Sequence, residues 1–188
     1  MQRICVYCGS SSGARPEYRQ AARELGQTLT SNGIELVYGG ASKGLMGIIA
    51  DEVLAGGGAA HGVIPKLLED KEIAHDGLTK LHVVGSMHDR KSMMAALSDG
   101  FIAMPGGFGT LEEIIEIVTW GQLAFHEKPV GLLNVEGYFD KLLAFIDHMV
   151  SEEFLKPENR AMLLVDSTAG GLIGQFERYT PPRVDKWI

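Results

Sequence analysis

The sequence lacks long apolar runs, has little cysteine and carries no excess of basic charge. Its N-terminus passes from a short apolar run, Ile4–Tyr7, directly into glycine and serine, so neither a signal peptide nor a membrane span fits. The formal net charge of −7 and the pI of about 5.3 offer no basic surface to nucleic acid or to an anionic membrane. We therefore expect a cytoplasmic protein that contacts neither nucleic acid nor membrane.

The two cysteines, Cys5 and Cys8, form a C-x-x-C pattern that is compatible with redox or metal chemistry. A zinc site needs two further ligands, and none of the six histidines forms a pair at metal-ligand spacing. Free cysteine behaves as a small hydrophobic residue and is usually buried. We therefore expect both thiols to pack in the interior, and we predict no metal.

Short β-rich runs alternate with longer segments of helical periodicity along the chain. The runs cover Arg3–Cys8, Glu35–Tyr38, Gly62–Ile64, Lys80–Val84, Gly100–Met104, Pro129–Leu133 and Met162–Val165. Helices are expected at 16–31, 44–56, 87–98, 110–125, 137–150 and 169–178. This alternation predicts an α/β fold, with a doubly wound parallel sheet and helices on both faces. For 188 residues we expect a single domain over residues 1–180 and a tail over 181–188.

Three of the β-rich runs end in glycine-rich loops, which begin at Cys8, Tyr38 and Met104. In a parallel sheet such loops gather at the carboxyl edge, where ligands bind. The first two loops are weaker signals, because glycine after a strand often only makes the turn. Lys43, in the second loop, is a candidate phosphate contact. The longest stretch without a clear element, 66–77, is a candidate lid.

The third loop continues as Pro105-Gly-Gly-Phe-Gly-Thr-Leu-Glu-Glu113 and opens a helix with one apolar face. The N–H groups of such a turn approach an anion closely, and the helix N-terminus adds about half a unit of positive charge. The glycine spacing matches neither G-x-G-x-x-G nor G-x-x-x-x-G-K-[ST], which favours a monophosphate over a dinucleotide or a triphosphate. Thr110 and Glu113 also fit a T-x-x-E capping box, so helix initiation alone remains an alternative for these two residues.

A second segment, Ser86-Met-His-Asp-Arg-Lys91, combines a helix start with two cations in an unfavourable place. Ser86 can cap the helix, and Asp89 suits its positive end. Arg90 and Lys91 each oppose the helix dipole by about 0.3–1 kcal/mol, which suggests an anion held between them and the helix end. An ordinary solvated basic pair explains these two residues equally well.

Together the two segments resemble the Lonely Guy family of cytokinin riboside 5′-monophosphate phosphoribohydrolases, proteins often labelled possible lysine decarboxylases. The resemblance extends over nearly the whole chain, including Tyr38–Gly47, Gly62–Pro65 and Lys128–Asn134. It departs from the family pattern at Ala41, where many relatives have a third glycine. The family implies a Rossmann-like homodimer that needs no cofactor. Its substrates are adenosine-type 5′-monophosphates, often N6-prenylated, which it splits into free base and ribose 5-phosphate.

The resemblance also implies roles for individual residues. Arg90 and Glu113 would be the catalytic pair, and Lys91, Glu72 and Thr119 would complete the substrate site. The substrate's phosphate and ribose would be enclosed by Gly106, Gly107, Phe108, Gly109, Thr110, Leu111 and Glu112. In such a site Glu113 would stabilise an oxocarbenium-like state and orient or deprotonate water, while Arg90 would hold the phosphate or ribose.

Two other functions remain as alternatives. A non-catalytic nucleotide or molybdenum-cofactor carrier would have a related fold, and fold does not determine function. A pyridoxal-phosphate lysine decarboxylase would need a Schiff-base lysine in a dedicated pocket, and no segment has that context. Release of free base from a nucleotide would separate the hydrolase from the carrier.

Overall fold

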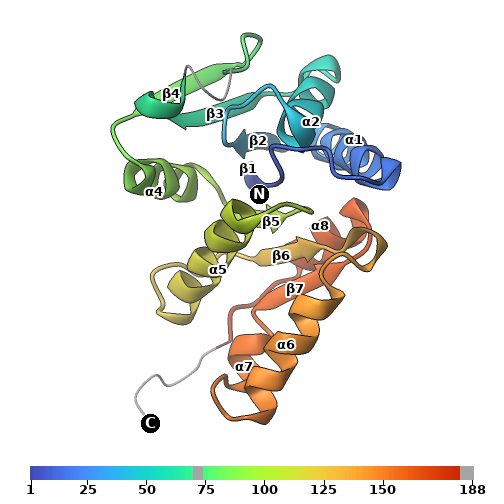
Figure 1. Cartoon of the computed structure of the whole chain (residues 1–188), viewed down its shortest axis with the longest axis vertical. Helices are drawn as coiled ribbons and strands as arrows, with labels where there is room; N and C mark the ends of the chain where they lie inside the picture. The colour runs from blue at the N-terminus through green and yellow to red at the C-terminus, as the bar shows by residue number, and fades with distance from the viewer. Residues whose placement is uncertain (70–73, 183–188) are drawn as a thin grey trace.

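The computed structural model describes residues 1–69 and 74–182, in which seven parallel strands form one sheet. The strands are β1 (Arg3–Tyr7), β2 (Glu35–Tyr38), β3 (Ala60–Pro65), β4 (Lys80–Val84), β5 (Gly100–Ala103), β6 (Val130–Leu133) and β7 (Leu163–Asp166). Their order in the sheet is β4-β3-β2-β1-β5-β6-β7, and Figure 1 shows them stacked in this order from β4 to β7. The predicted doubly wound α/β fold is confirmed.

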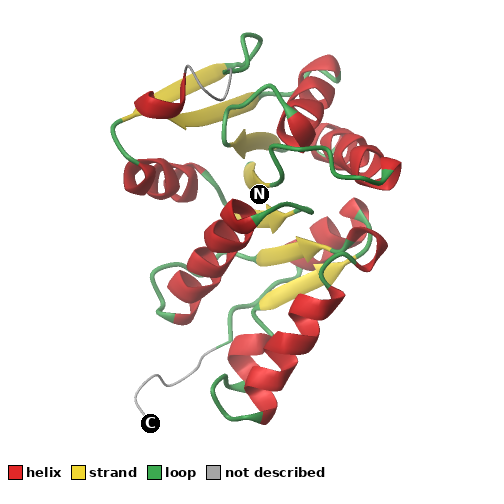
Figure 2. Ribbon diagram, in the orientation of Figure 1, coloured by secondary structure: helices red, strands yellow, loops and turns green. Residues whose placement is uncertain are grey.

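Helices connect the strands and cover both faces of the sheet (Figure 2). The longer helices are α1 (Pro16–Ser31), α2 (Gly44–Ala55), α4 (Met87–Leu97), α5 (Phe108–Gln122), α6 (Asp140–Ser151) and α8 (Ala169–Glu177). Residues of α1, α2 and α8 pack in one hydrophobic core, and residues of α4, α5 and α6 pack in the other. In Figure 1, α1 and α2 accordingly lie on the opposite side of the sheet from α4 and α5.

The central strand β1 explains why both cysteines are buried. Side chains of a strand alternate between its two faces, so Ile4 and Val6 join the core under α1 and α2, whereas Cys5 and Tyr7 join the other core. Cys8, at the end of the strand, belongs to the first core. The two thiols therefore pack on opposite faces, and both are free and buried, as expected.

The predicted elements differ from the observed ones mainly at their ends and in three short additions. The helix expected at 110–125 begins two residues earlier, at Phe108. Three short elements were not predicted: α3 (Lys66–Glu69), the 3-10 turn η1 (Val135–Gly137) and α7 (Pro157–Arg160). Elements of three or four residues are too short to show a helical period. The first of them, α3, lies in the stretch predicted to be a lid.

Two neighbouring strands at the centre of the sheet, β1 and β5, mark the point where the strand order changes direction. The chain runs outward from β1 through β2 and β3 to β4, and then returns to place β5 on the other side of β1. The loops after β1 and β5 diverge at such a point and leave a crevice at the carboxyl edge. No helix in the described part of the chain is both long and apolar enough to cross a membrane.

Candidate active site

A cavity of about 290 Å³ lies at the carboxyl edge of the sheet, where β1 and β5 adjoin. Its walls come mainly from the loops after β1, β2 and β5 and from the first turns of α4 and α5. The fold thus brings together the three glycine-rich loops and the Ser86–Lys91 segment. Among the described residues, the charged side chains that line this cavity are Arg90 and Glu113.

Arg90 extends from the first turn of α4, whose start is built as the sequence predicts. The Ser86 Oγ accepts a hydrogen bond from the Asp89 N–H at 3.1 Å and donates one to Asp89 Oδ2 at 2.8 Å. Arg90 is only 6 % exposed, and its Nη2 donates to the Gly39 carbonyl at 3.3 Å. Its Nε is buried and finds no hydrogen-bond acceptor among residues 1–69 and 74–182. Since buried polar groups are normally paired, this nitrogen indicates a position for a ligand oxygen.

Gly39 leaves room for the Arg90 side chain because it has no Cβ atom. A Cβ atom at position 39 would lie 2.1 Å from Arg90 Nη2 and 3.0 Å from Met46 Sδ. Any side chain there would displace the guanidinium from the carbonyl that now accepts its hydrogen bond. The second glycine-rich loop therefore has a definite task, which is to leave room for Arg90 at the wall of the cavity.

The glycine turn 105–107 delivers the amino end of α5 to the same cavity. Gly107 is the N-cap residue, and no side chain caps the helix. Thr110 is instead inside the helix and 4 % exposed, and its Oγ1 would lie only 2.1 Å from a Cβ at Gly106. The capping-box alternative for Thr110 and Glu113 is therefore wrong, because both residues lie beyond the cap. The first N–H groups of α5 are left for an anion.

Glu113 lies one turn further into α5 and lines the cavity together with Arg90. Its side chain is half-buried. Burial raises the pKa of the nearby Cys8 thiol well above its usual range, and the negative charge of Glu113 raises it further. Cys8 is thus neutral, and Glu113 is the only carboxylate among the described residues that line the cavity.

Lys91 has a different environment from its neighbour Arg90, although it is equally buried at 7 % exposure. Its Nζ donates to Glu112 Oε1 at 2.5 Å and to Glu116 Oε1 at 3.0 Å. Burial alone would lower the pKa of Lys91, but these two hydrogen bonds and the carboxylate charges outweigh it and raise that pKa. Lys91 therefore joins α4 to α5 through an ion-pair cluster beside the cavity.

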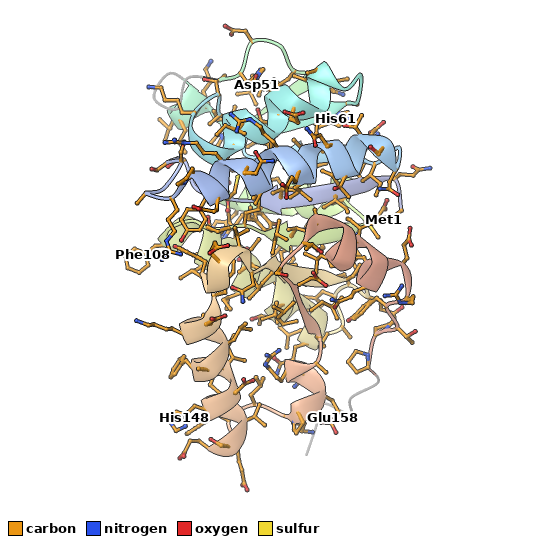
Figure 3. The ribbon with its side chains drawn as sticks, turned by 90° about the vertical axis from the view of Figure 1, so that its right-hand side faces the viewer. Met1, Asp51, His61, Phe108, His148 and Glu158 are labelled. Atoms are coloured by element: carbon orange, nitrogen blue, oxygen red, sulfur yellow. The ribbon has the colours of Figure 1, made fainter. Side chains whose placement is uncertain are left out.

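The remaining predicted site residues fall into three groups. Gly107, Phe108, Gly109 and Thr110 line the cavity, whereas Leu111, Glu112 and Thr119 lie on α5 outside its lining. Thr119 is exposed, and its hydroxyl donates to the Ile115 carbonyl at 2.8 Å. Glu72 lies outside the described residues. Phe108 is 93 % exposed, and Figure 3 shows its ring projecting outward from the molecule.

Several residues near the cavity carry no clear sequence signal. Met94 is only 1 % exposed, and it lines the cavity together with Met46. Tyr138 reaches the glycine turn from η1, and its hydroxyl donates to the Gly106 carbonyl at 2.6 Å. Nothing in the local sequence links position 138 to position 106.

Lys43, the candidate phosphate contact, is exposed and does not line the cavity.

Comparison with known proteins connects this site to one family. The family model described as "Possible lysine decarboxylase" matches residues 46–176. A probable cytokinin riboside 5′-monophosphate phosphoribohydrolase from Oryza sativa subsp. japonica is 51 % identical over 98 % of this chain and 75 % of its own length. A cytokinin riboside 5′-monophosphate phosphoribohydrolase from Arabidopsis thaliana is 51 % identical over 96 % of this chain and 84 % of its own length. The chain belongs to the Lonely Guy family.

Solved structures with this fold include more distant proteins. A molybdenum cofactor binding protein from Rippkaea orientalis superposes with a TM-score of 0.70 at 23 % identity, covering 94 % of this chain and 96 % of that one. The molybdenum cofactor carrier protein from Chlamydomonas reinhardtii gives the same TM-score, identity and coverage. At this identity the likeness establishes a shared fold, and the Lonely Guy member described here shares the Rossmann-like sheet with these carriers.

Proposed function

We propose that the protein hydrolyses the N-glycosidic bond of adenosine-type nucleoside 5′-monophosphates, releasing the free base and ribose 5-phosphate. The observation that carries this proposal is the placement of Arg90 and Glu113 in one cavity at the amino end of α5. One buried guanidinium nitrogen without an acceptor, one carboxylate and a helix N-terminus match the charges of a phosphorylated sugar that becomes cationic during cleavage. The relatives at about 50 % identity are named for this reaction.

In the proposed complex the 5′-phosphate accepts hydrogen bonds from the N–H groups of the glycine turn and the first turn of α5. Arg90 donates its Nε to a phosphate or ribose oxygen and so holds the sugar in a defined orientation, which lowers the barrier by positioning. Lys91 and Glu112 remain proposed substrate contacts beside the cavity. Their present ion pair would have to rearrange for either side chain to contact the ligand directly.

Glu113 is proposed to act at the anomeric carbon. The developing oxocarbenium charge is stabilised by the carboxylate, which also orients the attacking water and accepts its proton. Water adds its oxygen to C1′, the C1′–N9 bond breaks, and the base leaves with the bonding electron pair and takes up a proton. The step consumes one water and requires no cofactor.

Two alternatives are less well supported. A cofactor carrier has structural neighbours at 23 % identity, but a carrier has no need for a carboxylate opposite a buried arginine. A Schiff-base decarboxylase would require a lysine at the cavity, and no lysine lines it among the described residues. Lys91, the lysine next in sequence to Arg90, pairs with Glu112 and Glu116.

The experiment incubates the protein with AMP and, separately, with N6-isopentenyl-AMP, and follows free base by chromatography. Glu113→Gln should lower the rate of base release at least about 10²-fold, because the charge that stabilises the cation is lost. Its thermal unfolding midpoint should stay close to that of the wild type, since glutamine has the size of glutamate and the helix cap does not involve residue 113. Wild-type binding of both nucleotides without release of base would favour the carrier.

A homodimer is part of the same proposal. Large apolar side chains at Met87, Phe108 and Ile115, next to the cavity on α4 and α5, are between 41 % and 93 % exposed in the single chain. Where exposed apolar side chains form one contiguous patch, they mark an association surface, and we propose that these three do so. Light scattering coupled to size-exclusion chromatography should give a mass of two chains, and a monomeric mass would refute this part.

A further inference from the structure

The glycine turn 105–107 is held from its outer side by hydrogen bonds to two successive carbonyl groups. The Tyr138 hydroxyl donates to the Gly106 carbonyl at 2.6 Å. The Gly9 N–H donates to the Pro105 carbonyl at 3.1 Å. The turn therefore does not depend on glycine flexibility for its conformation; neighbouring elements fix the direction of its peptide groups.

The bond from Tyr138 also determines where the next N–H group points. The Gly106 carbonyl and the Gly107 N–H belong to one planar peptide unit, in which the two bonds point in opposite directions. Because the carbonyl is drawn toward Tyr138, the Gly107 N–H is directed to the opposite side of the turn. Gly107 lines both the main cavity and the adjoining pocket that Tyr138 lines, and its N–H donates to no described backbone carbonyl. The hydroxyl thus aims one N–H group at the proposed phosphate position.

A similar arrangement holds the first loop. The Gly9 carbonyl accepts a hydrogen bond from the Leu45 N–H at the start of α2, at 3.1 Å. By the same peptide geometry, the Ser10 N–H points away from α2. Ser10 lines the main cavity as well. The two loops at the switch point therefore each have a carbonyl tied to the surroundings and the following N–H left for a ligand.

Tyr138 is placed rigidly enough for this task. Its ring packs edge-on against Tyr18, with the centroids 5.7 Å apart, and against Phe139 at 5.0 Å. The backbone that leads into it has positive φ at Glu136 and Gly137, and the Asn134 side chain accepts the Phe139 N–H at 2.8 Å. These contacts fix the ring independently of its hydroxyl, so the hydroxyl can be removed without unseating the side chain.

We infer that Tyr138 is a positioning residue for the 5′-phosphate, whose hydroxyl orients the 106–107 peptide so that the Gly107 N–H can bind a phosphate oxygen. This inference rests on the proposed function, because it assumes a phosphorylated ligand in the main cavity. It assigns a role to a residue 32 positions away in sequence from the turn that it orients.

The test compares Tyr138→Phe with the wild type and with Tyr179→Phe as a matched control. Tyr179 lies just after α8, which runs from the carboxyl edge of the sheet back toward the amino edge. Tyr179→Phe therefore removes the same hydroxyl group at a site far from the turn. Titration calorimetry with ribose 5-phosphate measures phosphate binding without turnover, and steady-state assays with AMP give KM and kcat separately. Thermal unfolding of all three proteins reports on the fold.

In Tyr138→Phe we expect the Kd for ribose 5-phosphate and the KM for AMP to rise about three- to tenfold, the range of one lost hydrogen bond. The value of kcat should change less than about twofold, and Tyr179→Phe should match the wild type. Unchanged ribose 5-phosphate affinity in Tyr138→Phe, or no binding by the wild type, would overturn the inference. If Tyr138→Phe binds ribose 5-phosphate more weakly but the wild type releases no base, the role of Tyr138 is retained and the proposed hydrolase function is refuted.

Discussion

The charges at the two edges of the central sheet differ in whether neighbouring residues satisfy their hydrogen bonds. At the amino edge, Arg3 Nε lies 2.5 Å from Glu35 Oε2, and His61 Nε2 lies 3.0 Å from the same oxygen. Asp99 accepts the N–H groups of Gln2 and Arg3 at 2.6 and 3.0 Å. At the carboxyl edge, Arg90 is more deeply buried than any of these, yet its Nε has no acceptor in the described part of the chain.

This difference distinguishes charges that are paired within the fold from a charge that we propose to bind a ligand. A cation whose partners are supplied by neighbouring strands stabilises the sheet modestly. A buried cation with an N–H group that lacks an acceptor lowers the stability of the free protein, and sites of this kind are characteristic of binding and catalysis. Variants at the two edges should therefore affect different properties, and the comparison can be tested by measuring turnover and stability together.

The largest expected effect comes from removing the charge of Arg90. Arg90→Met should lower kcat/KM for AMP by about 10²–10³-fold, because a preorganised donor at the sugar phosphate is lost. Its thermal unfolding midpoint should equal or exceed that of the wild type, since a buried guanidinium whose Nε lacks an acceptor is replaced by an apolar chain of similar length.

The adjacent variant Lys91→Met provides the matched control for that result. It removes the same charge one residue later, where Glu112 and Glu116 are the partners, and should destabilise the fold by about 1–3 kcal/mol. Its kcat/KM should fall much less than that of Arg90→Met. If both variants lost activity equally, the contrast between the two cations would be invalid, and the charge of Lys91 would matter to turnover as much as that of Arg90.

A smaller effect is expected when Arg90 is kept but displaced. Gly39→Ala places a methyl group where Arg90 Nη2 now lies, and a misplacement of about 1 Å can reduce catalysis by up to about 10²-fold. We expect kcat/KM to fall about ten- to a hundredfold. In Gly170→Ala the added methyl meets no heavy atom within 4 Å, so activity should stay at the wild-type level. Wild-type kinetics in Gly39→Ala would contradict the proposed tether.

The smallest effect is expected at the amino edge. The hydrogen bond from Arg3, with a further one from His61, holds the pKa of Glu35 below its ordinary value. Because the folded pKa is lower than the unfolded one, the stabilisation is present above the unfolded pKa of about 4.3. It disappears as the pH falls through the folded value.

Glu35→Gln should therefore lower the unfolding midpoint slightly at pH 7, with a difference that vanishes in strong acid, and should leave turnover unchanged. Scanning calorimetry of both proteins across this pH range measures the effect. A loss of turnover in Glu35→Gln would show that the amino edge is not purely structural.

The sequence predicted the regular parts of this structure well and the contacts across them poorly. Runs such as Glu35–Tyr38 and Lys80–Val84 coincide with strands, because period and residue type are local properties. The capping box put the N-cap at Thr110, three residues after the observed N-cap Gly107, since a glycine N-cap has no side-chain signal. Local sequence patterns did not distinguish Arg90 from Lys91, to which only the family resemblance gave different roles, because their environments come from different helices and loops.

The sequence by itself determined the alternation of strands and helices, the glycine-rich loops and the family to which the chain belongs. These follow from local patterns that each segment carries independently of the rest. Only the tertiary structure decided which of two adjacent cations faces the cavity, which side chain occupies the space beside Gly39 and which hydroxyl donates to the glycine turn. Those features depend on atoms far apart along the chain, as in the contact between Tyr138 and Gly106, and packing of the doubly wound sheet is what brings them together.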